Sequence, residues 1–167
     1  MGEAHDYHDY HDHHDHHDHH HDHAPSHKEA CAIGGAQVSL EAHTHEQAAT
    51  VSLDIRPAAG SGFAFQKLVS AMRALASEAE ALGGIVGHIK AFAREGDAFA
   101  HASVTAADLP PESEGDIGAA FGSNATIQLV AIVLLVDQDA LVEVCKTTLQ
   151  QAETGFANCL FEPDERG

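Results

Sequence analysis

Residues 85–106 read IVGHIKAFAREGDAFAHASVTA, two stretches of alternating apolar and polar residues separated by Gly96-Asp97. A glycine-containing dipeptide between two such stretches is typical of a β-hairpin with a two-residue turn. In this register Phe92 lies opposite His101, whereas a slip of one residue would mix the two faces. We therefore predict strands over 85–95 and 98–106. Their shared apolar face is expected to consist of Ile89, Ala91, Ala93, Ala100, Ala102 and Val104.

Helices are predicted on both sides of this hairpin. Apolar residues recur every three to four positions between Phe65 and Leu82, and Gly83-Gly84 end the pattern. Ser61 is the expected N-cap of this helix. Further along the chain, the apolar run 125–136 predicts a strand buried on both faces, and Asp137 is expected to cap a second helix.

Two shorter strands are predicted before the first helix, over 37–42 and 51–56, and the acidic segment 107–123 is predicted to be a loop. The resulting order is β-β-α-β-β-β-α. It predicts the α+β class, a two-layer sandwich in which two helices cover a mainly antiparallel sheet of about five strands.

The chain is long enough for one domain, which we place at residues 36–160. Residues 1–27 are predicted to be a disordered tail rich in His and Asp, because they contain no apolar face and few helix formers. We expect a linker over 28–35 and a frayed end over 161–167.

Charge and cysteine content restrict the partners and the compartment. The chain has 26 acidic and 8 basic residues, a formal charge of −18, which argues against nucleic acid and against an anionic membrane surface. Its longest apolar run is too short to span a bilayer. Cys31, Cys145 and Cys159 lie far apart and form no CxxC motif, so we expect a protein of the reducing cytoplasm.

Residues 5–23 read HDYHDYHDHHDHHDHHHDH and carry the strongest chemical signal in the chain. Imidazole nitrogen suits Ni²⁺, Co²⁺, Zn²⁺ and Cu²⁺, and the interleaved Asp residues supply oxygen ligands or fix the imidazole tautomer. At about four to six ligands per ion, this segment would hold about two or three ions. The candidate ligands are His5, His8, His11, His13, His14, His16, His17, His19, His20, His21 and His23.

Histidines outside this segment form weaker patterns. His43 and His45 are two residues apart in an extended stretch next to Glu46, so both rings project to one side. They are candidate ligands of an ordered site that receives metal from the tail, and the alternative is a polar hairpin turn. His88 and His101 share the polar face of the predicted hairpin, where two ordinary surface histidines are the simpler interpretation.

The 5–23 segment resembles the His-rich segments of nickel accessory proteins, such as urease nickel chaperones and the His-rich hydrogenase-maturation GTPases. The rest of the chain departs from those GTPases, because it contains no GxxxxGK[ST] motif. The resemblance implies a metallochaperone with Ni²⁺, or Co²⁺ or Zn²⁺, as cargo, and a client metalloenzyme or maturation factor as partner. A homodimer is a further expectation.

Other functions remain open at this stage. No GxSxG, HExxH or GxGxxG motif marks a catalytic or cofactor site. One alternative is a small cofactor-assembly enzyme with a pocket lined by His43, His45 or His88. Another is an oligomeric metal-responsive subunit whose apolar strand over 125–136 completes the sheet of a partner.

Overall fold

The computed structural model describes residues 26–33 and 36–151. Most of the predicted tail and all of the predicted frayed end lie outside the described residues. Within the described part no helix is long and apolar enough to cross a membrane. The elements are β1 (His27–Ile33), β2 (Ala36–His45), β3 (Ala48–Arg56), β4 (Phe63–Ala64), α1 (Phe65–Ala81), β5 (Ile85–Glu95), β6 (Ala98–Val104), β7 (Glu112–Gly115), β8 (Ala120–Phe121), β9 (Thr126–Leu134) and α2 (Gln138–Gln151).

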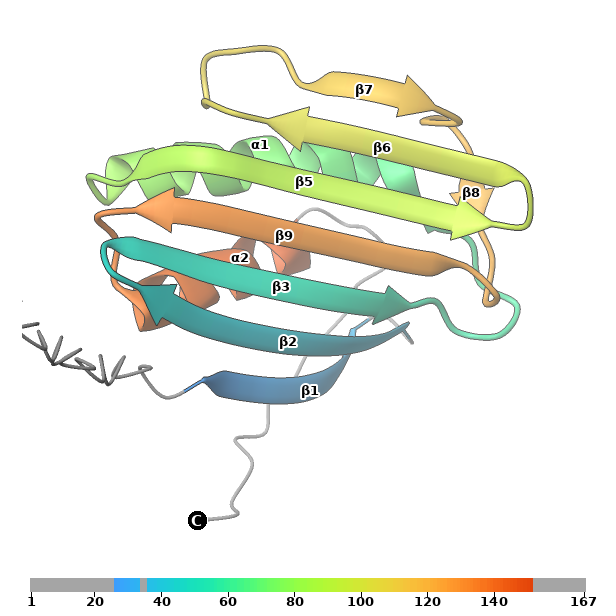
Figure 1. Ribbon diagram of the computed structural model, residues 1–167. Coiled ribbons are helices and arrows are strands. Elements are labelled where there is room, and N and C mark those ends of the chain that lie inside the picture. The colour runs from blue at the N-terminus through green and yellow to red at the C-terminus, as the bar shows by residue number, and fades with distance from the viewer. Residues whose placement is uncertain (1–25, 34–35, 152–167) are drawn as a thin grey trace, which may run out of the picture.

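Seven strands form one antiparallel sheet in the order β1-β2-β3-β9-β5-β6-β7, and β4 pairs with β8 in a small second sheet. The α+β prediction is confirmed, whereas the expected strand number of about five is too low. Figure 1 shows that α1 connects β3 to β5 while β9 lies between these two strands. This insertion makes the centre of the molecule a split β-α-β unit.

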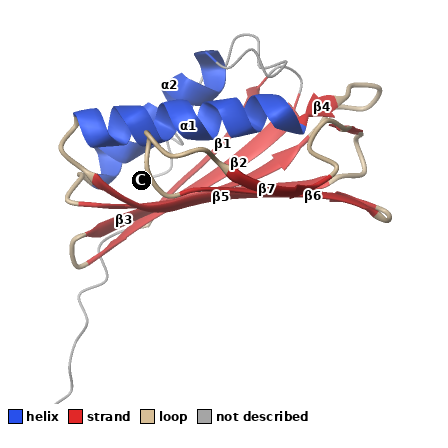
Figure 2. Ribbon diagram, turned by 90° about the horizontal axis from the view of Figure 1, so that it is seen from above, coloured by secondary structure: helices blue, strands red, loops and turns tan. Residues whose placement is uncertain are grey.

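Both helices pack on the same face of the sheet (Figure 2). We call this the covered face, and we call the opposite face, which no described helix or strand covers, the open face. Val51, Leu53, Leu129 and Ala131 lie on the covered face and are almost completely buried. Alternation along each strand places the neighbouring side chains on the open face.

The predicted hairpin is confirmed. β5 and β6 pair across Gly96-Asp97 with Phe92 opposite His101, and all six residues expected on the apolar face are buried. β6 ends at Val104 rather than at residue 106.

The first helix follows its predicted stripe but begins later. Ser61 does not cap it, because its hydroxyl donates a 2.8 Å hydrogen bond to the carbonyl of Ala58 in the preceding turn. The N-cap is Ala64, which makes no side-chain cap bond. Leu82, expected on the buried stripe, is 53% exposed because the helix ends at Ala81.

The linker predicted over 28–35 is largely strand β1, which pairs with β2. β1 turns Glu29 toward α2, where the carboxylate meets Lys146. A strand whose inward position carries a charge lacks the apolar alternation on which the prediction relied. The folded domain therefore begins before residue 36.

The acidic segment predicted as a loop contains β7 and β8. β7 pairs with β6, with Glu114 opposite His101, and all four of its residues are exposed. An edge strand needs no apolar face and is often charged, so hydrophobic periodicity gives no signal for it.

β9 is not buried on both faces as predicted. Its inward residues are buried, but Val130, Ile132 and Leu134 on the open face are only half-buried. Both of its edges are hydrogen-bonded, to β3 and to β5. A central strand cannot add to the sheet of a partner, so that form of the subunit alternative is wrong.

The cap predicted for the second helix is confirmed. Asp137 Oδ1 accepts hydrogen bonds from the backbone amides of Asp139 and Ala140, at 2.9 and 3.3 Å. Cys145 lies on the buried stripe of α2 with no exposed surface. Complete burial raises the pKa of its thiol to about 12.

Candidate functional site

The strongest candidate ligands, the eleven histidines between His5 and His23, lie outside the described residues. The structure does describe β1, the strand that follows these histidines in the chain. β1 starts at His27, which pairs with Ala42 of β2. The chain therefore enters the fold at the outer edge of the sheet, at the end where β2 turns into β3 (Figure 1).

His43 and His45 project from the open face at this same end of the sheet. Their neighbours on β2 point the other way: Ala42 is fully buried, and the Thr44 hydroxyl donates a 3.1 Å hydrogen bond to Gln138 of α2. Both imidazoles are exposed. The pair thus lies in the extended strand β2, and the hairpin turn given as the alternative is formed by the two residues that follow.

His88 and His101 also lie on the open face and are half-buried. His88 pairs with Ile132 of β9, and two further strands separate it from His43. Three strand spacings amount to about 14 Å, too far for one metal ion to be shared. Four of the five described histidines therefore face the same way without forming one cluster.

The described side chains of the open face do not form a metal site by themselves. Within residues 26–33 and 36–151, no three His, Cys, Asp or Glu side chains gather closely enough to hold an ion. Among the described residues, none adds a third side-chain ligand to His43 and His45.

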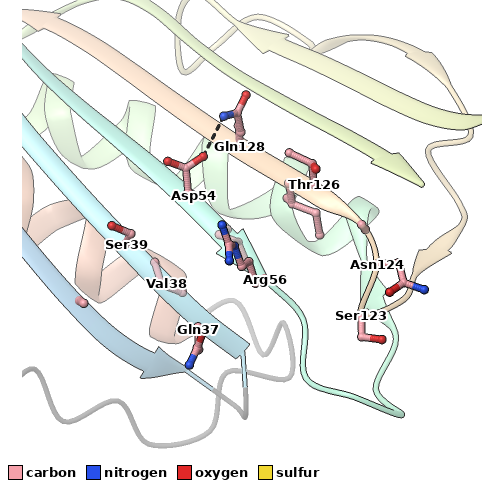
Figure 3. A pocket seen from close by; sticks show the side chains of 13 residues that line it. Gln37, Val38, Ser39, Asp54, Arg56, Ser123, Asn124, Thr126 and Gln128 are labelled. Atoms are coloured by element: carbon pink, nitrogen blue, oxygen red, sulfur yellow. Dashed lines mark hydrogen bonds between the residues drawn. The ribbon is translucent and has the colours of Figure 1, made fainter. Parts of the chain in front are cut away.

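A polar hollow of about 1010 Å³ lies at the opposite end of the open face (Figure 3). Arg56 and Asp54 of β3 and Gln37 of β2 line it, together with Gln128 of β9 and Asn124 in the preceding turn. Gln128 donates a 2.8 Å hydrogen bond to Asp54, which fixes one wall. None of the predicted site histidines lines the hollow. Sequence reasoning missed it because its residues come from separate strands and form no motif.

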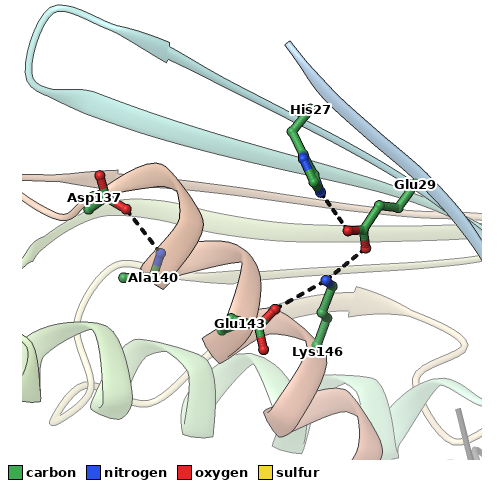
Figure 4. Close-up of polar contacts among 6 residues, drawn as sticks. All are labelled: His27, Glu29, Asp137, Ala140, Glu143 and Lys146. Carbon is green, nitrogen blue, oxygen red and sulfur yellow. Dashed lines mark hydrogen bonds and ion pairs between the residues drawn. The ribbon is translucent and has the colours of Figure 1, made fainter. Parts of the chain in front are cut away.

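A charged cluster fastens β1 to α2 (Figure 4). Lys146 Nζ lies 2.7 Å from Glu29 Oε2 and 3.1 Å from Glu143 Oε1, and His27 Nε2 lies 2.6 Å from Glu29 Oε1. The Lys146 and Glu29 side chains are only 10% and 11% exposed. The cluster therefore anchors the first residues of β1 to α2.

The environment of this cluster stabilises its charges. Burial alone would raise the pKa of the Glu29 carboxyl, but hydrogen bonds and positive charge from Lys146 and His27 hold it below its usual value. Burial likewise opposes the charge of Lys146, yet Glu29 and Glu143 raise the pKa of its ammonium group. The sequence signal for this cluster was weak, because its partners are more than one hundred residues apart.

The carboxylates near the predicted acidic loop make structural contacts. Glu95 accepts a 2.7 Å hydrogen bond from the backbone amide of Gly122, and Glu80 accepts one of 2.9 Å from that of Ala107. Asp116 accepts a 3.3 Å bond from the amide of Phe99. These bonds tie the loop to α1 and to the β5–β6 hairpin.

Comparisons with known proteins add no information on the function of this chain. No protein-family model matches the chain, and neither a curated protein nor a solved structure matches it.

Proposed function

We propose that this protein binds divalent transition-metal ions, nickel foremost and cobalt or zinc as alternatives, through the His/Asp segment of residues 5–23. The observation that carries the proposal is the density of ligands, eleven histidines interleaved with aspartates within nineteen residues. Residues 1–27 hold seven of the 26 acidic residues and none of the 8 basic residues, so they carry −7 of the total −18. Negative charge concentrates cations near the imidazoles.

The proposed role is storage of the metal, or its delivery to a client metalloenzyme or maturation factor in the cytoplasm. Each bound ion has to order the chain around it, so affinity per site is moderate and exchange is fast. Ligand exchange then transfers the ion to a stiffer site on the client.

Proton competition makes the binding reversible. Metal binds the neutral imidazole, whose ordinary pKa is about 6.5. Binding is therefore strong at pH 7.5 and is lost as the pH falls below about 6.

The test is a calorimetric titration of the full-length protein with Ni²⁺, Co²⁺ and Zn²⁺ at pH 7.5 and pH 5.0. We expect about two or three ions at the higher pH and at least about tenfold weaker binding at the lower one. A variant with all eleven histidines of residues 5–23 replaced by Asn should lose most of this capacity. The matched control is His88→Gln/His101→Gln, which should keep it. Equal nickel affinity at both pH values would refute the proposal.

The polar hollow supports a second candidate, a small cofactor-assembly enzyme whose tail stores the metal substrate. Arg56 and Asp54 present opposite charges into a space large enough for a small polar molecule. In this case Arg56→Ala should abolish the enzymatic activity of the full-length protein. The number of metal ions that the protein binds should stay unchanged.

A further inference from the structure

The hollow at the end of β3 presents two opposite charges from one strand (Figure 3). Asp54 and Arg56 occupy alternate positions, so both exposed side chains rise from the open face and their Cα atoms lie about 6.6 Å apart. Asp54 Oδ1 accepts the hydrogen bond from Gln128, which uses one of its two oxygens. Within the described residues Arg56 forms no ion pair, either with Asp54 or with another carboxylate. Its guanidinium is therefore free to bind a ligand.

The walls of the hollow are held in place by the fold. β3 is paired with β2 on one side and with β9 on the other. The turn that carries Asn124 is closed by a 3.1 Å hydrogen bond from the amide of Ala125 to the carbonyl of Gly122. Glu95 of β5 in turn accepts the 2.7 Å hydrogen bond from the amide of Gly122. A ligand therefore has to order few groups of the protein, which lowers the entropic cost of binding.

The lining side chains define the class of ligand. A guanidinium fork fits a carboxylate through two parallel hydrogen bonds. Asp54 is the only carboxylate among the described residues that line the hollow, and it can accept hydrogen bonds from an ammonium group. The amides of Gln37 and Asn124 add neutral donors and acceptors. In an α-amino acid the carboxylate carbon and the ammonium nitrogen are about 2.5 Å apart, so one molecule can contact both charges of β3.

The charge of the whole chain favours a zwitterion over an anion. The protein carries a formal charge of −18, which repels phosphate or a dicarboxylate and works against their capture by one arginine. A ligand whose charges balance experiences no net repulsion of this kind. A simple cation would be attracted by the chain as a whole but repelled locally by Arg56.

We propose that the hollow binds a free α-amino acid, with its carboxylate on Arg56 and its ammonium group on Asp54. This site is independent of metal binding by residues 5–23. It names the ligand class for the hollow on which the second candidate function rests, and it requires no chemical reaction.

Binding to the metal-free, full-length protein tests the proposal. Metal is first removed with a chelating resin, because amino acids themselves coordinate Ni²⁺. The standard amino acids are screened by saturation-transfer NMR, and the tightest is titrated into ¹⁵N-labelled protein. We expect a dissociation constant of about 1 mM or lower, with the largest amide shifts in residues 37–39, 54–56 and 123–128.

Derivatives of the same amino acid separate its two charges without any change to the protein. The N-acetyl derivative lacks the ammonium group, and the carboxamide lacks the carboxylate. Each should bind at least about tenfold more weakly than the parent, since each loses a charge-assisted contact.

Two variants assign those contacts to residues. Arg56→Gln should weaken binding of the amino acid at least about tenfold. Asp54→Asn keeps an acceptor for Gln128 but removes the negative charge, and should weaken binding at least about fivefold. The matched control is Arg94→Gln, which removes a positive charge from the open face outside the hollow. Two strand spacings of about 10 Å separate it from Arg56, so it should change the affinity less than about twofold.

Several results would overturn the proposal. One is the absence of binding for every amino acid at about 10 mM. Others are equal affinity for the N-acetyl derivative, tighter binding of inorganic phosphate, or unchanged affinity in Arg56→Gln. Equal urea midpoints show that the variants fold, and the derivative series needs only wild-type protein. The metal titration is a separate measurement, so each proposal can fail while the other stands.

Discussion

The covered and open faces of the seven-stranded sheet are built from the same strands yet differ in burial and in side-chain type. On the covered face most side chains of the central strands are aliphatic and buried under α1 and α2. The open face carries four of the five described histidines and four of the seven described Lys and Arg residues, namely Lys28, Arg56, Lys90 and Arg94. The difference teaches that the buried core forms on one face, so that polar and charged side chains can occupy the other without loss of core packing.

The largest effect is expected from a cavity on the covered face. Leu129 is 1% exposed in the central strand β9, so Leu129→Ala should lower the free energy of unfolding by about 2–5 kcal/mol. Its neighbour Val130 faces the open side and is half-buried, and Val130→Ala should cost about 1 kcal/mol or less. Urea denaturation measures both. Equal losses would contradict the distinction between the two faces.

A large effect is also expected in the reactivity of the Cys145 thiol, which lies on the buried stripe of α2. Burial raises the pKa of its thiol to about 12, so its thiolate population at pH 8 is about a thousandfold smaller than in the unfolded chain. Iodoacetamide labelling followed by peptide mass spectrometry should find Cys145 unmodified in the native protein and modified in urea. Rapid labelling of the folded protein would show that α2 detaches readily.

A smaller effect separates two ion pairs of β1. Lys146→Met leaves the Glu29 carboxylate with less compensation and should cost about 1–3 kcal/mol. Lys28 and Glu41, whose side chains are 68% and 51% exposed, form the matched open-face pair, and Lys28→Met should change stability by less than about 0.5 kcal/mol.

The pH dependence of the buried pair has a definite sign. The pKa of Glu29 is lower in the folded protein than its ordinary 4.5, so its contribution is present above that value and is lost as the pH falls through the folded pKa. Lys146 has a raised pKa, so its contribution is present below 10.5 and is lost at more alkaline pH. The difference between wild type and Lys146→Met should thus be largest at about pH 5–10 and shrink in acid. A difference that grows below pH 4 would contradict this ion pair.

The smallest effect is expected for His88→Gln/His101→Gln. Both side chains are half-buried on the open face, and the double substitution should change the free energy of unfolding by about 0.5 kcal/mol or less. Thermal unfolding of the metal-free protein measures it. A larger loss would mean that the open face also contributes to folding.

Periodicity predicted the parts of the fold in which burial repeats along the chain. The hairpin across Gly96-Asp97, the stripe of α1 and the cap at Asp137 all follow from local patterns that the structure retains. The edge strands β1 and β7 were missed, because an edge strand is held by backbone pairing and can be polar throughout. The outward side of β9 was misjudged for a related reason, since an aliphatic side chain such as that of Ile132 does not reveal whether anything covers it.

The candidate site divides in the same way. The proposed metal chemistry rests on the sequence by itself, because ligand type and density in residues 5–23 require no fold to be recognised. That His43 and His45 share a side follows from their spacing alone. Only the tertiary structure decided that β1 pairs with β2, with His27 opposite Ala42, and that Lys146, far away in the chain, holds β1 against α2. Strand pairing and ion pairing join residues that are distant in sequence, and local patterns carry no record of which partners will meet.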